Sequence, residues 1–106
     1  MSEALPLPEA VQTRAGLRAC SDALCDRLIG ILAARLTFVD RVAVLKAREG
    51  IAAAAPSRMQ AVVDRVRTRA EVTGFVPDIA GAMARVMIEQ RIAREARVSG
   101  QNGRDA

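Results

Sequence analysis

The sequence predicts an all-α protein of three helices, the first of them long. The chain of 106 residues is 51% hydrophobic but only 2% aromatic, a composition typical of helices rather than strands. Its apolar residues recur at three- and four-residue steps in segments that proline and glycine separate. At this length we expect one domain, residues 10–98, between an N-terminal tail, residues 1–9, and a disordered C-terminal tail, residues 99–106.

The first predicted helix covers residues 10–49, which contain no proline. Its helically spaced apolar residues are Leu17, Cys20, Leu24, Leu28, Ile31, Phe38, Val39 and Val42. Even a helix of roughly 32 residues, shorter than this segment, is about 48 Å long, which exceeds the diameter of a compact domain of this size. Because one chain cannot bury such a stripe, we expect a second chain to cover it.

Proline and glycine delimit the other two helices. Residues 50–55 interrupt the first pattern, and Pro56 suits the first turn of a second helix. Gly74 is expected to end that helix, and Pro77 and Asp78 to start the third. The apolar positions are Met59, Val62, Val63, Val66 and Ala70 in the second helix, and Ile79, Met83, Val86 and Met87 on one side of the third.

Charge and composition exclude several classes of function. The net charge is +4, but 16 cations are interleaved with 12 acids and no aromatic platform accompanies them, so we expect no nucleic-acid partner. A basic chain favours small polyanionic ligands. The chain has no His, Trp or Tyr, which excludes mechanisms that need a histidine base or a Ser-His pair.

Nothing in the sequence points to a membrane or a metal. No apolar stretch reaches 18 residues and no leader pattern occurs, so we expect a soluble, cytoplasmic protein without a membrane partner. Cys20 and Cys25 lie five residues apart on the first predicted helix, a spacing that suits neither a disulfide nor a metal site. We expect no metal and no cofactor.

Two cations interrupt the apolar stripe of the first predicted helix. Arg35 and Lys46 are 11 residues apart, which places them on one face about 16 Å apart along the axis. Burying two like charges is costly without an anion, and no carboxylate of this helix lies on the stripe beside Arg35. A bound dianion would supply the opposite charge. Alternatively, Arg35 sets the helix register and Lys46 extends to water.

The remaining candidate residues are less distinctive. Arg18 lies 17 residues before Arg35, about 25 Å away and roughly 100° around the helix, so both reach one ligand only if Arg18 comes from a partner chain. Glu95 shares a helix face with Arg91, and a surface ion pair between them is the alternative to a functional role. Arg58 lies in the first turn of the second predicted helix, and nothing in its local sequence distinguishes it from an ordinary solvated residue.

Taken together, five of these residues resemble the active-site pattern of the all-α (AroQ-type, type II) chorismate mutases. They are Arg18, Arg35, Lys46, Arg58 and Glu95, at spacings of 17, 11, 12 and 37 residues. The resemblance extends from Leu17 to Arg97 through the segments LRACSDALCDRL, ILAARLTFVDRVAVLKAREG, PSRMQAVVDRVRTRA and GFVPDIAGAMARVMIEQRIARE. It implies an intertwined homodimer with shared active sites that rearranges chorismate to prephenate in the shikimate pathway.

The resemblance also implies a role for each residue. Those that would bind the two substrate carboxylates are Arg35, Lys46 and Arg58 of one protomer and Arg18 of the other. Lys46 would also stabilise negative charge on the ether oxygen as its C–O bond breaks. Glu95 would approach this oxygen from the other side, and it must be protonated to donate a hydrogen bond. Lys46, Glu95 and Arg35 are thus the expected catalytic residues of a pericyclic reaction that needs no nucleophile.

Two residues depart from the family pattern. Met59 stands where some members have a glutamate that contacts the substrate hydroxyl. Arg91, which we include among the substrate-binding residues, stands where a small hydroxyl residue is often found. Isochorismate-pyruvate lyase, an enzyme on the same scaffold, tends to lack that glutamate and is one alternative. The Lys46 to Arg58 spacing and Glu95 favour a mutase over this lyase. A non-catalytic helical partner subunit is a further alternative.

Overall fold

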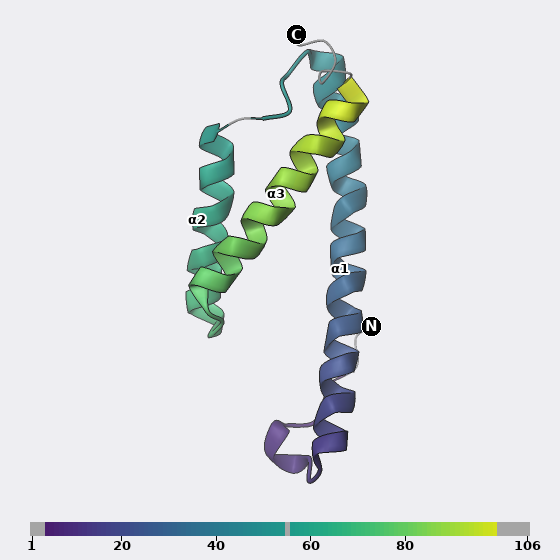
Figure 1. Ribbon diagram of the computed structural model, residues 1–106, viewed down its shortest axis with the longest axis vertical. Helices are drawn as coiled ribbons and strands as arrows, with labels where there is room; N and C mark the ends of the chain where they lie inside the picture. Colours follow the sequence, from purple (N-terminus) through teal and green to yellow (C-terminus); the bar gives the residue numbers. More distant parts are fainter. Residues whose placement is uncertain (1–3, 55, 100–106) are drawn as a thin grey trace. The chain divides into compact units, whose positions relative to one another are not determined.

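The computed structural model describes residues 4–54 and 56–99, and the chain divides into two units, Met1–Thr37 and Phe38–Ala106. A short 3₁₀ helix, η1, is followed by three α-helices (Figure 1). Their bounds are Pro8–Ala10 for η1, Arg14–Glu49 for α1, Pro56–Thr73 for α2 and Pro77–Ser99 for α3. The described residues contain no strand. The predicted all-α class with three helices and a long first helix is therefore confirmed.

The first helix begins later than the sequence predicts. α1 starts at Arg14 rather than near residue 10, because Thr13 caps it: the Thr13 Oγ1 accepts a hydrogen bond from the Gly16 N–H at 3.0 Å. Of the expected N-terminal tail, residues 1–3 lie outside the described residues. Of the expected C-terminal tail, residues 100–106 lie outside them, and Ser99 is the last residue of α3.

Within the unit Met1–Thr37, α1 has an apolar surface that this unit does not cover. None of the described residues of this unit is fully buried. Its exposed large apolar side chains on α1 are Leu17, Leu24, Leu28, Ile29 and Ile31. None of the helices in the described part of the chain is both long and apolar enough to cross a membrane.

Glycine ends both α1 and α2 in the same way. Gly50 and Gly74 have φ angles of 71° and 86°, a left-handed conformation that residues with a Cβ adopt at a cost. At the first of these ends the Ile51 N–H donates to the Lys46 carbonyl oxygen at 2.9 Å. The matching bond after α2 runs from the Phe75 N–H to the Ala70 oxygen at 2.8 Å. The predicted end of the second helix at Gly74 is confirmed.

The core of the unit Phe38–Ala106 lies between α2 and α3, which run in opposite directions and pack against each other (Figure 1). Its buried centre consists of Val63, Ala84 and Ile88, and Met59, Val62, Val66 and Ile92 pack against it. α3 therefore meets α2 largely through the face that carries Ala84 and Ile88. The side that carries Ile79, Met83 and Val86 is exposed in the single chain.

Candidate active site

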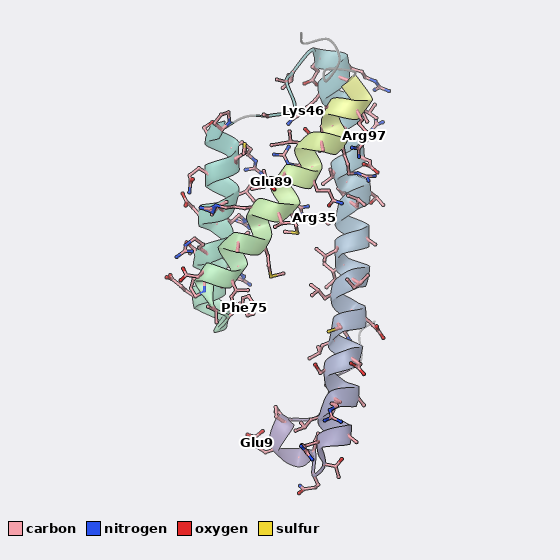
Figure 2. The ribbon with its side chains drawn as sticks, in the orientation of Figure 1. Glu9, Arg35, Lys46, Phe75, Glu89 and Arg97 are labelled. Carbon is pink, nitrogen blue, oxygen red and sulfur yellow. The ribbon has the colours of Figure 1, made fainter. Side chains whose placement is uncertain are left out.

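Lys46 lies in the last turn of α1, at the end of its unit opposite Phe75 (Figure 2). Its Nζ donates to the Glu95 Oε1 at 2.9 Å and to the Ala53 carbonyl oxygen at 3.3 Å. The side chain is only 21% exposed. A cation also interacts favourably with the partial negative charge at a helix C-terminus. Lys46 is thus held by protein acceptors rather than extended into solvent.

Glu95 is the buried anion of this cluster. It lies two turns after Ile88 on the buried face of α3, and its side chain is 1% exposed. Its Oε2 accepts a hydrogen bond from the Arg91 Nη1 at 3.0 Å, and the Arg91 side chain is 13% exposed. The i, i+4 pair considered from the sequence therefore exists, but its carboxylate is buried. Burial of this carboxylate is tolerable because each oxygen faces a cation.

The three side chains carry a net charge of +1. A lysine ammonium has three N–H donors, and for Lys46 two of them are used by Glu95 and Ala53. Among the described residues the third has no partner. This arrangement suits an ammonium group that presents one hydrogen to an anionic or electron-rich oxygen of a ligand.

A second ion pair, which sequence reasoning missed, lies between α1 and α3. Arg94 donates from Nε to the Asp40 Oδ1 at 2.9 Å and from Nη2 to Oδ2 at 2.8 Å. Hydrogen bonding from Arg94 lowers the pKa of Asp40 from 3.8; desolvation opposes this shift, and the charge of Arg94 adds to it. The two residues are 54 positions apart on different helices, so no local pattern in the sequence marks the pair.

The other candidate residues lie outside this hydrogen-bonded cluster. Arg58, in the first turn of α2, is exposed, and no hydrogen bond or ion pair joins its side chain to another described residue. Arg18 is exposed and Arg35 is partly exposed, both on the part of α1 that belongs to Met1–Thr37. Their separation of 17 residues is about 25 Å along one helix. The structure therefore brings together Lys46, Arg91 and Glu95.

A cavity of about 240 Å³ lies between α2 and α3. Its lining residues are Pro56, Met59, Gln60, Val63, Arg85, Ile88 and Glu89. Met59 and Ile88 belong both to this lining and to the apolar core. At the Met59 position the chain thus presents a thioether rather than a carboxylate, which offers no strong acceptor for a ligand hydroxyl.

The fold and the cluster define a class of protein: an all-α chain in which a lysine of the first helix and an arginine of the third share a buried carboxylate. The family model described as Chorismate mutase type II matches residues 17–96, a segment that contains every candidate site residue. The chain belongs to the chorismate mutase type II family. A comparison with curated proteins gives no match.

Proposed function

We propose that this protein is a chorismate mutase that converts chorismate to prephenate without a cofactor. The observation that carries the proposal is the Lys46 ammonium group, which two protein acceptors hold while one N–H keeps no partner among the described residues. Family membership supports chorismate as the substrate. A pericyclic rearrangement needs neither a nucleophile nor a proton acceptor, which agrees with a chain that contains no His.

In this proposal Lys46 stabilises the ether oxygen as its bond to carbon breaks, because negative charge grows there in the transition state. Glu95, whose carboxylate contacts the Lys46 Nζ, belongs to the same catalytic group. The two carboxylates of the substrate are bound by Arg35, Lys46 and Arg58 of one protomer and Arg18 of the other. Such anchoring would hold the substrate in its reactive folded conformation.

The active form is a homodimer in which the two chains share each site. The exposed apolar side chains of α1 support this part of the proposal, since Leu24, Leu28 and Ile31 are 51%, 44% and 66% exposed in the single chain. Contiguous apolar surface of this kind marks an interaction site. A partner chain that covers it would also bring a second Arg18 toward the site.

The direct test is incubation of the purified protein with chorismate, followed by chromatographic measurement of chorismate and prephenate. We expect prephenate to form at a rate proportional to protein concentration. The Lys46→Ala variant, purified identically, controls for a contaminating host mutase and should form far less. Absence of prephenate from the unmutated protein would refute the proposal.

A parallel incubation with isochorismate tests the second candidate, isochorismate-pyruvate lyase, which is favoured by Met59 in place of a carboxylate. Pyruvate and salicylate from isochorismate, with no prephenate from chorismate, would make the protein a lyase. Slow turnover by the isolated protein that rises when a partner enzyme is added would instead indicate a helical partner subunit.

A further inference from the structure

Both oxygens of the Glu95 carboxylate accept hydrogen bonds from cations. Oε1 is 2.9 Å from the Lys46 Nζ, and Oε2 is 3.0 Å from the Arg91 Nη1. A Glu95 that donated a hydrogen bond to a substrate would need a proton on one of these oxygens, although each already faces an N–H donor. The contacts therefore describe Glu95 as an ionised acceptor.

We propose that Arg91 is a positioning residue that acts on Lys46 through Glu95. Arg91 holds one oxygen of the carboxylate, and the other oxygen then holds the Lys46 ammonium group. The Ala53 carbonyl oxygen, 3.3 Å from the Lys46 Nζ, provides a second fixed point. The kinetic consequence of this proposal rests on the proposed function, because only turnover reports how well Lys46 stabilises the reacting oxygen.

Arg91 also determines the net charge around Lys46. A lysine paired with one glutamate forms a neutral pair, whose field at a developing negative charge is weak. Arg91 adds a second cation to the same carboxylate, and the cluster keeps a charge of +1. Removing Arg91 would leave the Glu95 Oε2, on a side chain 1% exposed, without its partner, and such a loss is costly in a buried site.

The kinetic test is a double-mutant cycle with Arg91→Gln, Glu95→Gln and the two combined, and with chorismate as substrate. If Arg91 acts through Glu95, Arg91→Gln should lower kcat by about tenfold while the KM changes by less than about twofold. The same substitution should cost much less in the Glu95→Gln background. Arg91→Lys should restore part of the activity, and Arg97→Gln, an exposed site on the same helix, should leave it unchanged.

A different kinetic result would overturn the proposal. If Arg91 instead binds substrate directly, as the sequence predicts, Arg91→Gln should raise the KM by the same factor whether or not Glu95→Gln is also present. Unchanged or increased kcat in the Glu95→Gln variant would also contradict an ionised anchor, because glutamine retains a donor but not the charge. Arg91→Met, a second neutral variant, replaces Arg91→Gln if the latter fails to fold by circular dichroism.

A measurement without substrate separates this inference from the proposed function. Hydrogen exchange of the Lys46 ammonium group, followed by NMR of the unliganded protein, should be slow in the unmutated chain and faster in Arg91→Gln. The double variant should exchange like Glu95→Gln alone. Unchanged exchange in Arg91→Gln would overturn the inference even if chorismate is consumed. Conversely, a protein that shows the expected exchange but forms no prephenate would refute only the proposed function.

Discussion

Residues from two different segments of the chain hold the Lys46 ammonium group in place. Glu95 approaches from α3, and Ala53 lies in the segment that follows the glycine at the end of α1. The backbone of Lys46 is fixed as well, since its carbonyl oxygen accepts from the Ile51 N–H at 2.9 Å. A charge held in this way needs little reorganisation when a reaction develops charge nearby, and this is the main source of electrostatic catalysis.

Replacing Lys46 with alanine should therefore cost about 3 kcal/mol or more of transition-state stabilisation, a fall of roughly 100-fold or more in kcat/KM. Steady-state kinetics with chorismate measure this loss. Arg48→Ala provides the matched control, because Arg48 is an exposed cation in the same helical turn, and it should keep near-normal activity. Near-normal turnover by the Lys46 variant would show that the ammonium group is not part of the site.

At the residue scale, the position of Lys46 in the apolar stripe and the resemblance of the five-residue spacing to a family pattern were enough to select Lys46 and Glu95 as candidates. They were not enough to predict the contact between these two residues. The pattern of the first helix predicts that a bound ligand supplies the charge opposite Lys46, whereas Glu95 on α3 already supplies one. The pairing of Arg91 with Glu95 follows from an i, i+4 spacing, but burial of the pair depends on how α3 packs, which no local pattern contains.

Two ion pairs join the C-terminal part of α1 to that of α3. Lys46 contacts the buried Glu95, and Asp40 contacts the more exposed Arg94. The Asp40 pair has two nearly parallel hydrogen bonds, a geometry that fixes orientation as well as distance. We infer that it aligns the two helices next to the candidate site.

The Asp40 pair should make stability depend on pH in the acid range. The pKa of Asp40 is lowered in the folded protein from its ordinary value of 3.8. The pair therefore stabilises the folded state fully at pH values above 3.8. This stabilisation disappears as the pH falls through the lowered value. Unmutated protein should therefore melt at a higher temperature than Asp40→Asn near neutral pH, and the difference should shrink toward strongly acid pH.

Thermal unfolding followed by circular dichroism at several pH values measures this difference. Asp26→Asn, at an exposed position on the same helix, is the control and should show no comparable pH-dependent gap. A gap between unmutated protein and Asp40→Asn that stays constant down to strongly acid pH would contradict the assignment.

At the element scale, helix ends marked by glycine or proline were predictable, since these residues change backbone geometry directly. Gly74 and Pro77 mark the end of α2 and the start of α3 as expected. The start of α1 was misplaced because threonine is a weaker signal: Thr13 caps the helix only through a side-chain hydrogen bond. The face of α3 that packs against α2 was also not predicted from the sequence, because the small residue Ala84 lies at the centre of the contact.

At the scale of the whole molecule, the exposed apolar surface of α1 and the outer side of α3 require an explanation. Large side chains such as Ile31, Phe38 and Val86 are at least 66% exposed in the single chain. In the proposed dimer a partner chain covers such residues, and a site built from both chains then follows from twofold symmetry. The sequence arguments for a partner came from the length of the first helix, from the separation of Arg18 and Arg35 along it and from the family resemblance, and they are independent of these exposures.

The proposed shared site has a consequence that single variants cannot reveal. Arg18→Ala and Arg35→Ala homodimers should both be nearly inactive, since each of their sites lacks one carboxylate ligand. In a mixed dimer, one site carries both substitutions and the other carries neither. Chorismate turnover should therefore return when the two inactive variants are combined.

The measurement that tests the account most directly is the chorismate mutase activity of the two variants after they are mixed equally, denatured and refolded together. Random pairing makes about half of the dimers mixed, so the account predicts roughly a quarter of the activity of refolded unmutated protein. Each variant refolded alone serves as the baseline. A mixture as inactive as its parents, beside unmutated protein that regains activity, would contradict the shared site.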